Sequence, residues 1–312
     1  MRSHGAYRAM IWLPVAGNYA DIDVYASIIA YADLLNQRGK AAKTYIPVAP
    51  NYSVPKALRL PEWENATFNL QPSDKVIILD ISIPEEIAKF ASDSQILELI
   101  DHHPGYEDYW HERIGDKAII EKIGAVATSI FEWWGECWDY NKMSPQTAKL
   151  LLGAILDNTL NFTAQITTER DHQAATQLSE IADTTLADFT TWYFSEVSKT
   201  IISDLKNALL QDCKTVVLPT NQSKFTFCQL TLWDAKDITA QQDRITQIMN
   251  NTHPAWLVSV ICISENKNYL IARSPEIRDY LTRLLNLEVE GNWLTSSQLH
   301  LRKEIIAKML KK

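Results

Sequence analysis

Gln95-Ile-Leu-Glu-Leu-Ile-Asp-His-His-Pro104 is the stretch that decides the fold of this chain. Its apolar run over residues 96–100 is broken by one glutamate and ends in Asp101, His102 and His103, after which a proline turns the chain. Strands of parallel sheets deliver side chains in this way to their carboxyl edge, where open α/β sheets bind ligands. Carboxylate and neutral imidazole groups suit divalent metals. A polar loop after a strand is the alternative, and the triplet alone does not decide between the two.

Two further predicted strands lead into acidic side chains. A strand predicted over residues 9–15 is followed by Asp21 and Asp23, which precede a helical pattern over residues 25–37. The run Val76-Ile-Ile-Leu79 ends directly in Asp80. Because the predicted strands alternate with helices, we expect a doubly wound, mainly parallel sheet with these ends on one edge. Helix N-capping explains the first acidic pair alone, but it does not explain three such strand ends.

Composition indicates a globular protein of two domains. The chain has 312 residues, and a domain typically takes roughly 100–200. Hydrophobic residues make up 46% and charged residues 22%, which is typical of a soluble globular protein. No apolar run approaches the roughly 20 residues needed to span a bilayer, so we expect no membrane partner. The segment after the charged residues 1–8 becomes polar too soon for a signal peptide, so we expect a cytoplasmic protein.

Cysteine spacing and net charge exclude several kinds of site. Cys137, Cys213, Cys228 and Cys262 lack paired spacing, which argues against a zinc site or a redox pair and predicts ordinary reduced core thiols. The formal net charge of −8 disfavours broad electrostatic binding to nucleic acid. It leaves room for an anionic substrate, because divalent cations in an acidic pocket present positive charge locally.

The α/β pattern divides into two domains and a linker. We predict a first domain over residues 1–188, an amphipathic helical linker over 189–212 and a smaller α/β domain over 213–312. In the first domain, helices predicted over residues 124–138 and 144–156 lead to Asp157 and Asn158. In the second, a helix predicted over residues 296–310 carries the basic pair Arg302-Lys303, for which a solvated helix end near the C-terminal dipole is the alternative reading.

Four motifs in this order resemble the DHH phosphoesterase superfamily. More narrowly, the chain looks like the branch with a DHHA2 C-terminal domain, which holds manganese-dependent inorganic pyrophosphatases and prune-type exopolyphosphatases. The resemblance covers nearly the whole chain and is less sharp in its C-terminal part. The motifs are Asp21-Ile-Asp23, Val76-Ile-Ile-Leu-Asp80, Asp101-His-His103 and Gly153-Ala-Ile-Leu-Asp-Asn-Thr-Leu-Asn-Phe162.

The resemblance implies a hydrolase that cleaves phosphoanhydride bonds of pyrophosphate or short polyphosphate with metal-activated water. The implied cofactor is a divalent metal, Mn²⁺ before Mg²⁺ or Co²⁺. His103 matches a residue that contacts phosphate, and Asp101 matches the partner that orients a neighbouring histidine. Arg302 and Lys303 fall near a basic substrate-binding motif. The residues that match metal ligands are Asp21, Asp23, Asp80 (shared between metals) and His102, with Asp157 and Asn158 in the fourth motif.

Two departures concern the metal ligands. The pyrophosphatases place a histidine before the first aspartate pair, where this chain has Gly17-Asn18-Tyr19. In the fourth motif the family's ligand aspartate aligns with Asn158, and Asp157 stands one residue earlier. A neutral asparagine is a weaker ligand than an aspartate. Either Asp157 replaces it through a local shift, or one metal site is impaired.

These departures keep other functions open. One is a catalytically impaired family member that binds phosphate compounds or a partner protein without turnover. Another is a phosphodiesterase of short oligonucleotides or cyclic dinucleotides, which is disfavoured because those proteins carry a glycine-rich motif in their second domain. This chain has 9 glycines, and beyond Gly153 only Gly291 remains. The sequence is compatible with a homodimer and does not determine the oligomeric state.

Overall fold

The computed structural model describes residues 9–17, 19–64, 66–211 and 213–310. Residues 1–8, on which the prediction about a signal peptide depends, lie outside this range, as do Asn18, before the first motif, and Asp212 at the end of the predicted linker. The chain divides into two compact units, Met1–Tyr193 and Phe194–Lys312, which are described separately.

The first unit is built on a parallel sheet of five strands in the order β2-β1-β3-β4-β5, and the predicted doubly wound α/β class is confirmed. Strand β3 is apolar along four of its five residues and fully buried there, as expected of a strand covered on both faces. Strands β1, β3 and β4 are neighbours, so their carboxyl ends lie side by side. The strands are β1 (Ile11–Pro14), β2 (Ala42–Tyr45), β3 (Lys75–Leu79), β4 (Ile96–Asp101) and β5 (Ala118–Ile120).

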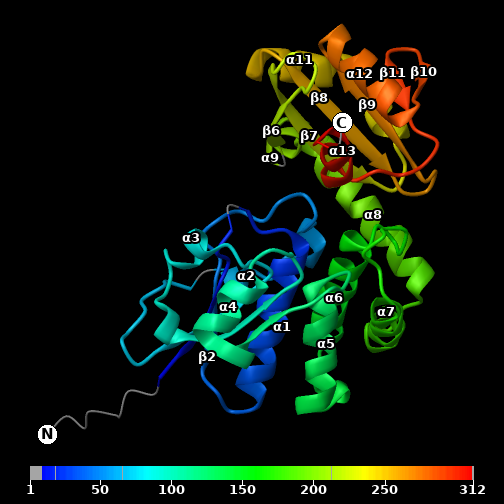
Figure 1. Ribbon diagram of the computed structural model, residues 1–312. Helices are drawn as coiled ribbons and strands as arrows, with labels where there is room; N and C mark the ends of the chain where they lie inside the picture. Colours follow the sequence, from blue (N-terminus) through cyan, green and yellow to red (C-terminus); the bar gives the residue numbers. More distant parts are fainter. Residues whose placement is uncertain (1–8, 18, 65, 212, 311–312) are drawn as a thin grey trace, which may run out of the picture. The chain divides into compact units, whose positions relative to one another are not determined.

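Helix α1 (Ile22–Gln37) is buried along most of its length because it contacts both the sheet and two other helices, α5 and α6 (Figure 1). On the sheet's other face, Trp12 and Leu99 pack with Trp110 of α4. The remaining helices of this unit are α2 (Pro61–Glu64), α3 (Pro84–Ile87), α4 (Glu107–Ile114), α5 (Val126–Cys137), α6 (Pro145–Asn158) and α7 (Glu169–Ile181), with 3-10 turns at Lys56–Leu58, Asp93–Gln95, Gly115–Lys117 and Tyr140–Lys142.

Helix α8 (Leu186–Ser203) contains the boundary between the two units, and α9 (Leu205–Gln211) comes after it. Both fall within or beside the segment predicted as a helical linker. No helix in the described part of the chain combines the length and the apolar character that a membrane crossing needs.

The second unit is a six-stranded mixed sheet in the order β10-β11-β9-β8-β7-β6, in which β7 and β8 are parallel and the other neighbours antiparallel. Phe227 and Leu257 of the sheet pack against Leu281 and Ile305 of two helices, which makes an apolar core. The elements are β6 (Cys213–Val217), β7 (Lys224–Leu232), α10 (Lys236–Thr239), α11 (Gln242–Thr252), β8 (Trp256–Cys262), β9 (Lys267–Ala272), α12 (Pro275–Leu285), β10 (Glu288–Glu290), β11 (Trp293–Thr295) and α13 (Arg302–Leu310).

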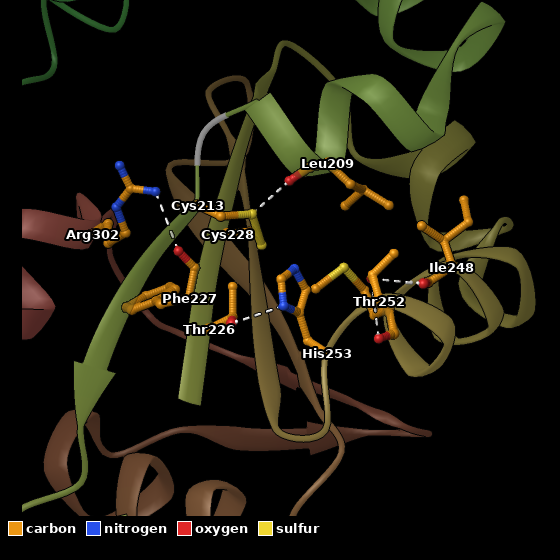
Figure 2. Close-up of a disulfide and its surroundings, with 10 residues drawn as sticks. Leu209, Cys213, Thr226, Phe227, Cys228, Ile248, Thr252, His253 and Arg302 are labelled. Carbon is orange, nitrogen blue, oxygen red and sulfur yellow. Dashed lines mark hydrogen bonds between the residues drawn. A yellow bond between two sulfur atoms is a disulfide. The ribbon is translucent and has the colours of Figure 1, made fainter. Parts of the chain in front are cut away.

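The prediction of four reduced core thiols is wrong. Cys213 and Cys228 form a disulfide between β6 and β7, where antiparallel pairing places them opposite each other (Figure 2). Only strand register brings together two residues 15 positions apart, so their sequence spacing carried no signal. Cys262 is a free buried thiol as expected, whereas the free Cys137 is exposed.

Candidate metal centre

Asp80 stands at the carboxyl end of β3, and one oxygen of its carboxylate has no hydrogen-bond donor among the described residues. Its backbone N–H still donates to Ile100 O, at 2.8 Å, and its φ of 62° then turns the chain out of the strand. Aspartate is one of the few residues other than glycine that adopt this left-handed conformation readily. Oδ1 of Asp80 is buried and accepts no hydrogen bond from the described residues. Such an atom is costly to bury unless a cation compensates it.

His102 presents an unprotonated ring nitrogen to Asp80. Its Nδ1 lies 3.0 Å from Ile123 O, and a carbonyl oxygen only accepts, so Nδ1 carries the proton. Nε2 is then the nitrogen without a proton, and it lies 3.5 Å from Asp80 Oδ1. Burial lowers the pKa of His102, which favours the neutral ring. Nε2 of His102 and Oδ1 of Asp80 are thus two electron-pair donors that face each other, which is the arrangement of two metal ligands.

His103 is held by Asp101 at the end of β4. Asp101 is 1% exposed, and its Oδ1 accepts from His103 Nδ1 at 2.8 Å and from the backbone N–H of His102 at 2.8 Å. Burial favours a raised pKa for Asp101, but the hydrogen bond and positive charge of His103 outweigh it and lower this pKa. Burial opposes a charged His103, yet Asp101 raises the pKa of its imidazole. The His103 side chain is 59% exposed, so it presents a donor to solvent.

Asp80, His102 and His103 each contribute a possible ligand atom, and these atoms lie within 4.8 Å of one another. Burial, followed by the charges of Asp23 and Asp21, raises the pKa of Asp80 well above its usual value. Several buried carboxylates thus repel one another beside Nε2 of His102, which carries no proton. This donor set fits a divalent cation.

Asp21 and Asp23 hold different positions at the start of α1. Asp21 is the N-cap, and its Oδ1 accepts from Val24 N at 3.2 Å, so the capping alternative describes part of its role. Asp23 lies inside the first turn, is fully buried, and accepts from Val126 N and Ala127 N of α5, each at 2.9 Å. Burial and then the charge of Asp23 raise the pKa of Asp21 to about 6, and burial also raises the pKa of Asp23.

Asn158 and Asp157, at the end of α6, each have a hydrogen-bond partner. Asn158 Nδ2 donates to Asp23 Oδ2 at 2.5 Å. Asp157 Oδ1 lies 3.1 Å from the hydroxyl of Tyr193, which also lies 2.8 Å from Ser53 O. Burial raises the pKa of Asp157 to about 7, against the opposing hydrogen bond from Tyr193. Sequence reasoning missed Tyr193, because it stands in the predicted linker and no motif marks it.

The chain leaves α6 through a strained turn. Three successive residues, Leu160, Asn161 and Phe162, have positive φ values of 50°, 51° and 67°. Leu160 is buried, and the ring of Phe162 stacks on His172 with centroids 4.3 Å apart. These side-chain contacts hold a backbone conformation that residues other than glycine seldom adopt.

Arg302 and Lys303 begin helix α13 of the second unit. The backbone N–H of Arg302 donates to Gln229 Oε1 at 2.7 Å. Its guanidinium Nη1 donates to Phe227 O at 3.3 Å, as Figure 2 shows. Arg302 is 7% exposed and Lys303 is exposed. The alternative of a solvated helix end near the C-terminal dipole is therefore wrong, since the pair stands at a helix start and Arg302 is buried.

Comparisons with known proteins show which family and which fold this chain resembles. The model of the DHH family, N-terminal domain, matches residues 13–155. The manganese-dependent inorganic pyrophosphatase of Bacillus subtilis is 25% identical over 283 residues, which cover 87% of this chain and 88% of that protein. Among solved structures, a Methanococcus jannaschii protein assigned to the family II inorganic pyrophosphatases matches with a TM-score of 0.64 at 18% identity, over 98% and 99% of the two chains. An exopolyphosphatase-related protein from Bacteroides fragilis matches with a TM-score of 0.50 at 13% identity, over 97% and 91%. The predicted family resemblance is confirmed, and the structural matches show the fold.

Proposed function

From the DHH family domain that residues 13–155 form, we propose that this protein is a metal-dependent hydrolase of phosphoanhydride bonds, with pyrophosphate or short polyphosphate as its substrate. The observation that carries the proposal is the buried Oδ1 of Asp80, which has no donor among the described residues and faces the unprotonated Nε2 of His102. Relatives of similar length are named manganese-dependent inorganic pyrophosphatases, which supports Mn²⁺ as the cofactor.

Asp80 and His102 would hold the cation. A bound divalent cation supplies a Lewis acid that acidifies water and neutralises phosphate charge. The Ile123 carbonyl keeps the His102 proton on Nδ1, so Nε2 stays available as a ligand. These contacts fix the ring before substrate arrives, which is how precise geometry is maintained in a hydrolytic site.

His103 would bind a phosphate oxygen of the substrate. Asp101 accepts its Nδ1 proton at 2.8 Å and raises its pKa, so the exposed ring offers a charge-assisted donor. In the second unit, considered by itself, Arg302 and Lys303 are candidates for phosphate binding, through a planar fork and a point charge respectively. The backbone N–H of Arg302 and its guanidinium both donate to β7, at Gln229 Oε1 and Phe227 O, and these contacts fix the side chain in place.

A second candidate function is phosphate binding without turnover. The observation that favours it is the amide of Asn158, which donates to Asp23 where the family resemblance implies an acidic ligand. A neutral donor at this position reduces the charge available to hold metal ions. Binding of pyrophosphate without its hydrolysis would identify this function.

Phosphate release tests both functions. Purified protein is incubated with pyrophosphate, tripolyphosphate or a dinucleotide in the presence of Mn²⁺, Co²⁺ or Mg²⁺, together with Asp80→Asn and His102→Ala. The exposed Asp116→Asn is the matched control, because it removes a carboxylate away from the centre. We expect metal-stimulated release from pyrophosphate or tripolyphosphate that both site variants abolish. Release from the dinucleotide alone, or no release with any metal, would contradict the proposed hydrolase.

A further inference from the structure

We propose that this centre holds one divalent cation per chain, at Asp80 and His102, and that the amide of Asn158 supplies a hydrogen-bond donor in place of a second cation. The inference rests on the proposed metal dependence and adds the number of cations, which a count of acidic residues leaves open. Asp21, Asp23, Asp80 and Asp157 bring four carboxylates to this region, enough ligands for two cations.

The carboxylates of this centre differ in the hydrogen-bond donors that they receive, and so in how much each one needs a cation. Asp21 accepts from Val24 N, Asp157 has the hydroxyl of Tyr193, and Asp23 accepts from two backbone N–H groups and Asn158. Donors of this kind stabilise the ionised form of a carboxylate and fill its lone pairs. Oδ1 of Asp80, in contrast, receives no donor from any described residue. A cation is therefore needed beside Asp80 and less so beside the others.

Beside Asp23, the amide of Asn158 takes the place that a second cation would fill. Its Nδ2 lies 2.5 Å from Asp23 Oδ2, a separation at which two ionised carboxylates would repel strongly unless a cation lay between them. An amide donates a proton across the same gap and needs no cation. The contact joins the end of α6 to the first turn of α1, so it also fixes the orientation of Asp23.

Tyr193 gives Asp157 a hydrogen-bond partner within the fold. Its ring is fully buried, and its hydroxyl lies within hydrogen-bond distance of both Asp157 Oδ1 and Ser53 O. The tyrosine comes from α8, far from the four acidic motifs in sequence. A carboxylate held in this contact is a poor candidate to replace the neutral Asn158 as a metal ligand. The Asn158 amide and the Tyr193 contact together leave the centre with ligands for one cation.

Counting bound manganese tests the inference with a readout other than activity. Metal-stripped full-length protein is titrated with Mn²⁺, and free Mn²⁺ is followed by its paramagnetic resonance signal. We expect one equivalent bound to the natural protein and to Asp116→Asn, none to Asp80→Asn, and two to Asn158→Asp. Circular dichroism establishes whether Asn158→Asp is folded; if it is not, the count on the natural protein decides alone.

The outcomes separate the two claims. Two tightly bound equivalents on the natural protein would overturn the single-cation inference, as would a folded Asn158→Asp that still binds only one. One equivalent without any phosphate release would support the inference and refute the proposed hydrolase. No bound Mn²⁺ would refute both.

Discussion

Asp157→Asn should stabilise the metal-free protein at neutral and higher pH, because the natural carboxylate is buried at a cost in free energy. Burial raises the pKa of Asp157 from its usual 3.8 to about 7. A difference of this size corresponds to about 4 kcal/mol once the group is ionised in the folded protein. Asparagine has nearly the same shape, and its amide can donate to the Tyr193 hydroxyl while that hydroxyl donates to Ser53 O. The substitution therefore removes a charge without removing the hydrogen bonds.

The direction of the pH dependence is set by proton binding. Between pH 3.8 and about 7 the folded chain keeps the Asp157 proton while the unfolded chain releases it. The stabilisation that this proton gives is complete below pH 3.8 and is lost as the pH rises through 7. We expect the variant and the natural protein to unfold alike near pH 4 and to differ by about 4 kcal/mol at pH 8.

Urea unfolding in the presence of a chelator, followed by circular dichroism from pH 4 to 8, measures the difference. The charges of Asp21 and Asp23 contribute to the raised pKa of Asp157, so the expected difference includes their repulsion. Asp116→Asn, which changes an exposed carboxylate, should unfold like the natural protein throughout. A difference that does not change with pH, or an Asp157→Asn variant less stable than the natural protein at pH 8, would refute the reasoning.

Three further predictions concern stability and are measured by urea unfolding. Asp171→Ala removes the buried acceptor of four hydrogen bonds and should cost about 3 kcal/mol or more, because each stranded donor is expensive to bury. Gly124→Ala would place a Cβ 2.6 Å from Thr159 Cγ2 and should destabilise the folded protein by about 1–3 kcal/mol. Stability equal to that of the natural protein would show that the turn at Thr159 moves to make room. The double variant Cys213→Ser, Cys228→Ser should lose about 3 kcal/mol, and a reducing agent should lower the stability of the natural protein alone.

Strands with long apolar runs were predictable because burial on both faces leaves a strong pattern. Strands β3 and β4 end within a residue of their predicted ends, at Asp80 and Asp101, so the acidic edge of the sheet could be placed from sequence. Strand β5 and helix α4 carried no such pattern, because β5 has three half-buried residues and α4 buries only Trp110.

The candidate centre was predictable only in part. Motifs marked Asp23 and His102 but could not show what their neighbours donate. Tyr193 and the Ile123 carbonyl act through single contacts between residues far apart in sequence. Such contacts produce neither a hydrophobic periodicity nor a motif of fixed spacing in the sequence. The disulfide was missed for the same reason, since its two cysteines meet through strand register.

The left-handed turn after α6 determines which substitutions a selection for heat resistance could accept. A left-handed conformation costs most residues other than glycine about 1–2 kcal/mol, and asparagine adopts it more readily than leucine or phenylalanine but less readily than glycine. Glycine should therefore be gained at position 161, whereas Leu160 and Phe162 should persist because one is buried and the other stacks on His172. Variation in this loop is thus directed by the backbone as much as by the chemistry of the acidic residues before it.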